Sequence, residues 1–229
     1  MLGNLYLTGF RDIPRDEAAA RRWFERARDV GHIPAAKRLG DLYRDGIGGA
    51  RDVKKAMACY KQAATLDLAS AQFALGQLLF DGAAGVRADK KRALAWFQAA
   101  ARHEHPGALY ALGRAYDLGD GVTADQQLAI GFYKSAALLD DPAAMVAMGT
   151  YFYEGAILPK DPTMARRWFQ EGANRSDPDG MFNLAAMMIR GEGGAADRRQ
   201  ALALMQQAAA LGHGKSAQAL TALETSRLD

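Results

Sequence analysis

The chain has 229 residues, of which 49% are hydrophobic and 24% are charged, and only 7 are prolines. Such a composition provides enough apolar surface for a core and excludes a disordered tail or a collagen-like fibre. The 29 basic and 26 acidic residues give a net charge of +3. This balance excludes the strongly basic footprint of a nucleic-acid-binding protein, so we expect no nucleic-acid partner.

The sequence also limits the cross-links and the compartment. Cys59 is the only cysteine, so it cannot form an intramolecular disulfide or a four-thiolate zinc site. No apolar run approaches the roughly 20 residues of a membrane helix, and the first residues lack the pattern of a secretory signal. We expect a soluble protein without a membrane span, cytoplasmic by default, and periplasmic or secreted if a signal peptide has been removed.

One pattern returns every 36 or 37 residues along the chain. It starts with a Leu or Met before Gly, at Leu2-Gly3, Leu39-Gly40, Leu75-Gly76, Leu112-Gly113 and Met148-Gly149, and weakens at Leu184-Ala185 and Leu220-Thr221. A second glycine follows at Gly9, Gly46, Gly82, Gly119, Gly155 and Gly191, and an aspartate at Asp16, Asp52, Asp89, Asp125, Asp161 and Asp197. A bulky pair comes next, at Trp23-Phe24, Cys59-Tyr60, Trp96-Phe97, Phe132-Tyr133, Trp168-Phe169 and Leu204-Met205. These landmarks divide a single repeat domain, 1–229, into repeats 1–34 (truncated), 35–70, 71–107, 108–143, 144–179 and 180–215, and a terminal capping helix 216–229.

Each repeat is predicted to form a helix, a glycine-bearing loop and a second helix, named helix A and helix B below. In repeat 35–70, Leu39 and Tyr43 are four residues apart and lie on one buried face of helix A. Gly46 can end helix A in the left-handed conformation, and Asp52 can cap the start of helix B. We therefore interpret the six recurring aspartates as helix caps and not as catalytic acids.

The glycine inside helix A predicts close packing of the two helices. Glycine costs about 1 kcal/mol relative to alanine in a helix, so its recurrence needs a reason. At Gly40, Gly76, Gly113 and Gly149 the missing side chain leaves room for the aromatic pair of helix B. Where alanine replaces this glycine, at Ala185, the pair also loses its aromatic rings and becomes Leu204-Met205.

The pattern Ala-x-x-x-Leu-Gly-x-x-Tyr-x-x-Gly, then Asp, an aromatic pair and Ala-Ala, resembles the Sel-one-like repeat, from Leu2 to about Lys215. The resemblance implies an all-α fold, a right-handed α-solenoid of tandem helix-turn-helix repeats similar to tetratricopeptide repeats. Members usually serve as adaptors or scaffolds, which implies a non-enzymatic role in protein–protein interaction. A subset with paired cysteines in each repeat has been linked to β-lactam binding, and a chain with Cys59 alone does not fit that subset.

The two ends depart from the pattern. In the last helix, Thr221 and Glu224 fill the glycine and tyrosine positions, which predicts the polar outer face of a solenoid cap. At the start, Leu2-Gly3 falls partway through helix A. Either the first repeat frays, or residues or a partner precede Met1.

No catalytic constellation stands out, so we expect no catalytic residue, no metal site and no cofactor. His32 and His213 lie in turns between repeats, where they are interpreted as structural. His103, Glu104 and His105 share one loop, but no second cluster completes a set of three or four metal ligands. The glycine run 46–49 lacks the preceding strand and the Gly-Lys-Ser/Thr of a phosphate loop, and is interpreted as a linker.

Three positions of helix A point away from its buried stripe at about 100° per residue, namely two before, two after and five after the Leu of the Leu-Gly pair. Residues at these positions are predicted to be open. Those predicted to bind a partner are Lys37, Asp41, Arg44, Phe73, Gln77, Phe80, Tyr110, Arg114, Asp117, Val146, Thr150, Tyr153, Phe182 and Ile189. Leu7 and Ala186 hold the same positions in their repeats. Several of the predicted binding residues are aromatic, although an ordinary solvated face would be mostly charged.

The family resemblance implies that this face lines a concave groove. We expect a protein or peptide to lie there, with Phe73, Tyr110 and Tyr153 as anchors and with Arg44 and Arg114 orienting a carboxylate or polar group. The alternative is that neighbouring helices cover these aromatic side chains.

Charge is unevenly distributed along the chain. Residues 1–114 carry 19 basic and 12 acidic groups, and residues 115–229 carry 10 and 14. An acidic partner would be attracted to the first half, and head-to-tail self-association through the uncapped N-terminal end is also possible. We interpret the basic clusters Lys54-Lys55 and Lys90-Lys91-Arg92 as solvated helix faces. A second class of function stays open: an immunity or inhibitor protein that blocks a bacterial effector enzyme, or a hydrolase.

Overall fold

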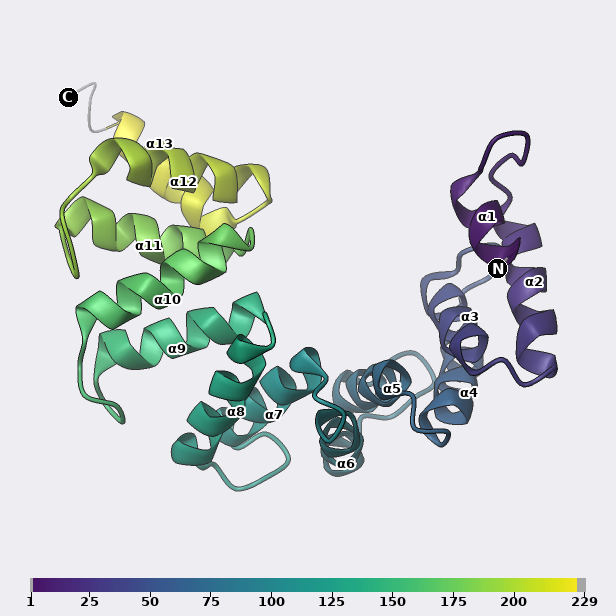
Figure 1. The fold of residues 1–229 in the computed structure, drawn as a ribbon. Coiled ribbons are helices and arrows are strands. Elements are labelled where there is room, and N and C mark those ends of the chain that lie inside the picture. Colours follow the sequence, from purple (N-terminus) through teal and green to yellow (C-terminus); the bar gives the residue numbers. More distant parts are fainter. Residues whose placement is uncertain (1, 226–229) are drawn as a thin grey trace. The chain divides into compact units, whose positions relative to one another are not determined.

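The computed structural model describes residues 2–225, which form thirteen α-helices and no strand (Figure 1). In chain order the helices are α1 (Leu2–Thr8), α2 (Glu17–Asp29), α3 (Ile33–Asp45), α4 (Val53–Ala64), α5 (Ala69–Asp81), α6 (Lys90–Ala101), α7 (Pro106–Leu118), α8 (Gln126–Leu138), α9 (Pro142–Glu154), α10 (Pro162–Asn174), α11 (Pro178–Arg190), α12 (Arg198–Ala210) and α13 (Gly214–Thr225). The expected terminal helix therefore begins at 214, and residues 226–229 and the side chain of Glu224 lie outside the described part. The prediction of an all-α fold is confirmed.

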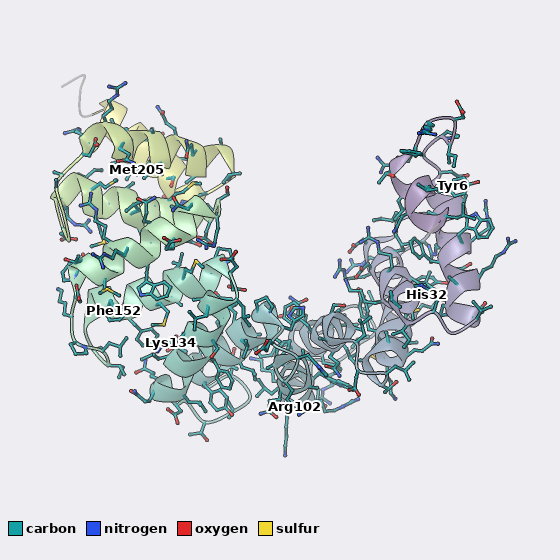
Figure 2. The ribbon with its side chains drawn as sticks, in the orientation of Figure 1. Tyr6, His32, Arg102, Lys134, Phe152 and Met205 are labelled. Atoms are coloured by element: carbon teal, nitrogen blue, oxygen red, sulfur yellow. The ribbon has the colours of Figure 1, made fainter. Side chains whose placement is uncertain are left out.

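Odd-numbered helices are the A helices and even-numbered helices are the B helices. Within each compact unit an A helix packs against the B helix that follows it, as α5 does with α6 and α9 with α10, and neighbouring hairpins contact each other in sequence, as α4 does with α5 and α10 with α11, which is the packing of a repeat solenoid. The chain divides into two compact units. The first consists of the residues up to Ala115 together with residues 119–123, and the second consists of residues 116–118 together with the residues from Ala124 on. In the second, Met205 is buried and Phe152 packs against the same core (Figure 2).

An aspartate caps every B helix. The Asp52 carboxylate accepts a hydrogen bond from the backbone N–H of Lys55 at 2.9 Å, and Asp161 accepts one from Met164 at 2.9 Å. The carboxylates of Asp16, Asp89, Asp125 and Asp197 do the same at 2.8, 3.0, 3.0 and 2.9 Å. These bonds satisfy backbone donors that the first helical turn leaves free. The predicted capping role of the recurring aspartates is confirmed.

The glycine of helix A lies directly beneath an aromatic ring of helix B. A Cβ atom added to Gly40 would stand 2.5 Å from the Tyr60 ring, and one added to Gly149 would stand 2.6 Å from the Phe169 ring. Real Cβ atoms do not approach other atoms so closely, so any side chain here would displace the ring. The predicted close approach is confirmed at Gly40, Gly76 and Gly149.

The loop between α3 and α4 packs on the start of the preceding B helix. Gly48 has a φ of 73°, and a Cβ atom added to it would overlap the carbonyl oxygen of Glu17. Beside this contact, the Arg21 guanidinium donates to the Ala50 carbonyl at 3.3 and 3.4 Å. The glycine run 46–49 is therefore a contact between repeats, which is more than the linker that we expected.

The loop between α11 and α12 repeats this arrangement. Gly193 has a φ of 67° and faces the Pro162 carbonyl, while Arg166 donates to the Ala195 carbonyl at 2.8 Å. Both loops read Gly-x-Gly-Gly-Ala, and both arginines stand five residues after the cap aspartate of their helix. The Gly-x-Gly-Gly-Ala loop and the arginine that binds it thus occur together in these two places of the sequence.

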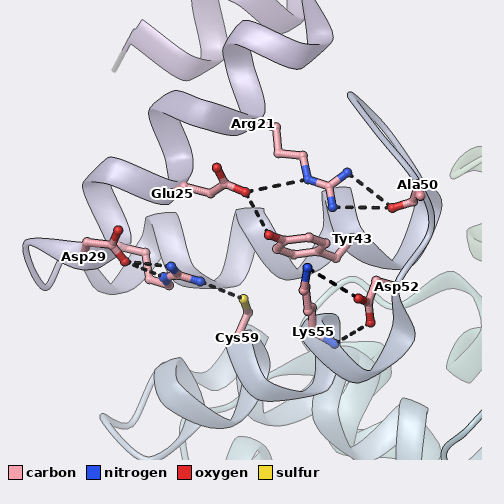
Figure 3. A network of polar contacts seen from close by, with 9 residues as sticks. Arg21, Glu25, Asp29, Tyr43, Ala50, Asp52, Lys55 and Cys59 are labelled. Atoms are coloured by element: carbon pink, nitrogen blue, oxygen red, sulfur yellow. Dashed lines mark hydrogen bonds and ion pairs between the residues drawn. The ribbon is translucent and has the colours of Figure 1, made fainter.

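Tyr43 joins the first two repeats (Figure 3). Its hydroxyl donates to the Glu25 carboxylate at 2.8 Å, and the Arg21 guanidinium lies 3.9 Å from its ring centre. Nearby, Arg28 approaches the Cys59 sulfur at 3.9 Å. Burial raises the pKa of both the Tyr43 hydroxyl and the Cys59 thiol above their usual values. Cys59 is therefore a buried packing residue with little thiolate character.

Three of the A helices begin at a histidine. The Nδ1 atoms of His32, His105 and His213 accept hydrogen bonds from backbone N–H groups at 3.2, 3.3 and 3.3 Å, at the starts of α3, α7 and α13. Asp141 and Asp177 occupy the same position in α9 and α11. The structural interpretation of His32 and His213 is confirmed, and the sequence analysis missed their capping role because histidine is not among the preferred cap residues.

Candidate partner-binding face

A hollow of about 280 Å³ lies between helices α3 and α5. Arg44 and Gln77, both predicted to be open, line it. Arg51 and Asp81 also line it, and the sequence analysis did not select them. Asp81 stands six residues after its Leu, about 40° beyond the nearest selected position on the helix, so the open face is wider than three positions.

A second hollow, of about 220 Å³, lies between helices α9 and α11. The selected positions Thr150 and Tyr153 line it, together with Ala186. Asn183 and Arg190 complete the lining, and the Arg190 guanidinium donates to the Tyr153 hydroxyl at 3.2 Å. This hollow offers an aromatic ring, hydroxyl groups, an amide and a cation within one small area.

The two hollows occupy the same place in the repeat. Arg44 and Tyr153 are each five residues after the Leu or Met of their repeat, and Gln77 and Ala186 are each two residues after it. A third hollow, of about 600 Å³ between α1 and α3, is lined by Leu7, which also holds the five-after position. We call this recurring space between neighbouring A helices the A-helix seam.

Asp41 is buried, so the expectation of an open position there is wrong. Only 8% of the residue is exposed. Its carboxylate accepts hydrogen bonds from the Tyr60 hydroxyl at 2.9 Å and from the Lys37 Nζ at 2.9 Å. Burial, together with the neighbouring Asp41 charge, raises the pKa of Tyr60 far above its usual value. Lys37, a second selected residue, is therefore held in this ion pair and is only half-exposed.

Asp117 takes a related role in the second compact unit. Its carboxylate accepts from the Tyr151 hydroxyl at 2.6 Å and from the Tyr133 hydroxyl at 3.2 Å. Burial and then this hydrogen bond raise the pKa of Tyr151. Tyr133 and Tyr60 hold one position of helix B, at which three other repeats have phenylalanine, namely Phe24, Phe97 and Phe169. A tyrosine at this position thus coincides with an aspartate on helix A, a signal that the sequence carries.

Phe73 and Phe182 pack against the histidine caps of the next repeat. The Phe73 and His105 ring centres are 4.6 Å apart, and those of Phe182 and His213 are 5.3 Å apart. Both phenylalanines are half-buried. Neighbouring repeats therefore cover part of these rings, which is the alternative considered for this face.

Phe80 and Val146 also take part in packing. The Phe80 ring centre is 6.0 Å from that of Phe97, and the Lys90 Nζ lies 5.2 Å from the Phe80 centre. Val146 fills the space above Gly172, where an added Cβ atom would meet its methyl group. Both side chains are half-buried and contribute less open surface than the sequence analysis predicted.

Of the remaining selected residues, Tyr110 is half-buried, Arg114 is exposed, and Ile189 is 37% exposed. Four selected residues line the seam, namely Arg44, Gln77, Thr150 and Tyr153.

Residues 2–225 place no three His, Cys, Asp or Glu side chains where they could hold a metal ion. In the loop of His103, Glu104 and His105, the Nδ1 atom of His105 is engaged as a helix cap. No helix in the described part of the chain is long and apolar enough to cross a membrane.

Stacked A–B hairpins with a recurring seam define an α-solenoid repeat protein. The model of the Sel1 repeat matches this sequence six times, at residues 1–32, 33–68, 69–105, 106–141, 142–177 and 178–213. The chain belongs to the Sel1 repeat family, and the resemblance inferred from its sequence is confirmed.

Solved structures agree with this assignment. A Sel1 repeat protein from Oxalobacter formigenes is 33% identical, with a TM-score of 0.85 over 97% of this chain and 64% of that one. A protective antigen of uropathogenic Escherichia coli with an SLR fold is 32% identical, with a TM-score of 0.81 over 94% of this chain and 46% of that one. The chain thus spans about half to two thirds of these relatives. None of the curated proteins matches the sequence.

A more distant structure shares the fold. An immunity protein from Pseudomonas aeruginosa is 17% identical, with a TM-score of 0.61 over 93% of this chain and 83% of that one.

Proposed function

We propose that this chain is a non-enzymatic scaffold that binds a protein or a peptide along its A-helix seam. Sel1 repeat proteins generally act in protein interaction. The observation that carries the proposal is the recurrence of the seam at equivalent places, between α1 and α3, α3 and α5, and α9 and α11. A surface that repeats along a solenoid offers an extended partner a series of similar contacts.

The seam residues have the chemistry of binding hot spots. Tyr153 provides an aromatic ring with a polar tip, and aromatic and arginine residues contribute most to interface energies. Arg44 already forms a bidentate pair with Asp45, at 2.7 and 2.9 Å, which lowers the pKa of Asp45. Arg114 has no hydrogen bond or ion pair among the described residues, so we assign it the larger role in orienting a partner carboxylate.

Binding of selected peptides tests the proposal. A displayed library of 12-residue peptides is selected on the purified chain, and the affinity of an enriched peptide is measured by fluorescence polarisation. Replacing Tyr110 and Tyr153 by alanine together should weaken binding more than about tenfold, because two aromatic anchors are lost. Far-UV circular dichroism should show unchanged helical content.

A matched control uses an exposed aromatic residue that lines none of the three hollows of the seam. Phe10 lies in the loop after α1 and is 52% exposed, so Phe10→Ala should leave the affinity unchanged. Equal affinities for the double variant and the wild type, or an equal loss in the Phe10 variant, would contradict binding at the seam.

Two alternatives differ in their support. Of the four histidines, three are engaged as helix caps, which leaves few candidates for the base of a hydrolase. The immunity-protein alternative is itself a protein-binding function, and the Pseudomonas aeruginosa protein shares the fold alone. A one-to-one complex that abolishes the activity of one enzyme, without peptide binding at the seam, would favour it.

Head-to-tail association through the N-terminal end stays a prediction. An apolar hollow of about 340 Å³ in the first repeat, lined by Leu2, Trp23 and Val30 among others, is consistent with it. Sedimentation velocity over a range of protein concentrations tests it, and a constant monomer mass would contradict it.

A further inference from the structure

Helices α4 and α6 carry six basic residues and no acidic residue. Three of the six have partners: Lys55 and Arg92 pair with the cap aspartates of their helices at 3.7 and 3.9 Å, and Lys90 pairs with Asp120 at 2.7 Å. The other three are exposed and form no ion pair within the described part of the chain: Lys54, Lys61 and Lys91.

Two arginines of the flanking loops extend this set. Arg87 precedes α6 and Arg102 follows it (Figure 2), and both are exposed without an ion pair to any described residue. Asp67, Asp81 and Glu104 are exposed acidic residues in the turns and at the helix end that flank the set. We call Lys54, Lys61, Arg87, Lys91 and Arg102 the basic surface.

A contact between neighbouring repeats brings two of these cations, Lys54 and Arg87, to the same loop in the first compact unit. The Lys54 side chain runs along the next loop, because a Cβ atom added to Gly85 would stand 2.8 Å from its Cε. This contact puts the Lys54 charge close to the loop that carries Arg87. Lys61 lies two helical turns further along α4, at about 10 Å. Lys91 holds the position of Lys54 one repeat later.

We propose that the basic surface binds an acidic segment of a partner protein, at a place distinct from the A-helix seam. Glutamate side chains two turns apart on a helix match the spacing of Lys54 and Lys61. Unpaired, exposed cations attract such a segment over several ångströms and speed its association. The sequence analysis interpreted Lys54 and Lys91 as parts of solvated helix faces and did not select Lys61, and the lack of ion-pair partners is what the structure adds.

The basic surface is less suited to nucleic acid or to an anionic membrane than to an acidic protein segment. Helices α4 and α6, both fully described, offer little aromatic surface, since Tyr60 and Phe97 are buried and Trp96 is half-buried. Binding of single-stranded nucleic acid relies on such rings for base stacking. The two helices also expose no large apolar side chain to enter a bilayer. An acidic protein segment needs neither.

A charge-reversal experiment tests the proposal. The probe is a fluorescein-labelled dodecaglutamate peptide, titrated with the full chain at 0.05 M NaCl. The triple variant Lys54→Glu, Lys61→Glu, Lys91→Glu should bind it at least about tenfold more weakly, and binding by the wild type should weaken steeply by 0.5 M NaCl as charges are screened. Circular dichroism confirms that the variant is folded.

The control variant carries the same change in net charge elsewhere. Lys134, Arg167 and Arg198 are exposed on the B helices of the second compact unit, and their triple replacement by glutamate should weaken binding by less than about threefold. An equal loss in both variants, or no binding by the wild type, would overturn the proposal. Tighter binding of a dodecathymidine oligonucleotide or of phosphatidylserine vesicles through the same three lysines would overturn the assignment of the partner class. The variant Tyr110→Ala/Tyr153→Ala, which tests the proposed function, should still bind the peptide, and this separates the two tests.

Discussion

The Tyr60 hydroxyl donates a 2.9 Å hydrogen bond to the Asp41 carboxylate, one residue from the glycine that the Tyr60 ring covers. One side chain of helix B thus contacts two adjacent positions of helix A, with its ring over Gly40 and its hydroxyl on Asp41. The carboxylate is buried and would lose a donor if the hydroxyl were absent. In this repeat the position of Asp41, which was predicted to be open, therefore belongs to the buried core.

Removing the hydroxyl tests this coupling. Tyr60→Phe should lower the free energy of unfolding by about 1–3 kcal/mol, because the buried Asp41 carboxylate loses a partner. The double variant Tyr60→Phe/Asp41→Gln reproduces the combination of Phe97 and Gln77 in the next repeat and should recover part of the loss. Urea denaturation measures both. Equal stabilities of the single and double variants would show that the two residues are not coupled.

High pH should weaken the fold through the same tyrosine. Burial, and then the nearby Asp41 charge, raises the pKa of Tyr60, so the folded state holds this proton more tightly than the unfolded chain does. The contribution is fully present below about pH 10, where tyrosine ionises in unfolded chains, and is lost as the pH rises above it. The urea midpoint of the wild type should fall above pH 10 more steeply than that of Tyr60→Phe. Parallel slopes would contradict the assignment.

Adding a methyl group beneath the ring should also destabilise the protein. Gly40→Ala places a Cβ atom 2.5 Å from the Tyr60 ring, and overpacking of this kind costs about 1–3 kcal/mol. Gly131 is the matched control, since it lies in the exposed middle of α8 with no atom within 4 Å of an added Cβ. Gly131→Ala should stabilise the chain by about 0.5–1 kcal/mol. Thermal unfolding of the two variants should therefore shift in opposite directions.

The periodic sequence predicts what each residue does within its own hairpin. The glycine beneath the ring and the aspartate cap follow from local spacing, and both were recovered. Contacts between hairpins depend on the length of each side chain and on the distance to the next helix. A helical wheel gives only the direction of a side chain about the helix axis. For this reason Asp41 was wrongly expected to be open, and Phe73 was not expected to stack on His105. The width of the seam was also underestimated, since Asp81 and Arg190 lie just outside the positions chosen.

The loop contact predicts a difference between two left-handed glycines. Gly193→Ala introduces both an unfavourable φ of 67° and an overlap with the Pro162 carbonyl, whereas Gly212→Ala introduces an unfavourable φ of 87° with no atom within 4 Å. The left-handed conformation alone costs about 1–2 kcal/mol, so Gly212→Ala measures that term. Gly193→Ala should be more destabilising in urea denaturation. Equal losses would mean that the loop moves away from the Pro162 carbonyl at little cost.

The histidine caps predict a stabilising substitution. At the start of α3 the Nδ1 atom of His32 accepts from the Ala35 N–H, whereas Asp141 does the same for α9 with a carboxylate. A negative charge at a helix start is favourable by about 0.3–1 kcal/mol, so His32→Asp should raise the stability at pH 7 by that amount. His103→Asp is the control, because His103 is exposed and follows the C-terminal end of α6, where a negative charge is not favourable, so this variant should not raise the stability. A lower unfolding midpoint for His32→Asp than for the wild type would show that the imidazole makes a contribution that the carboxylate does not replace.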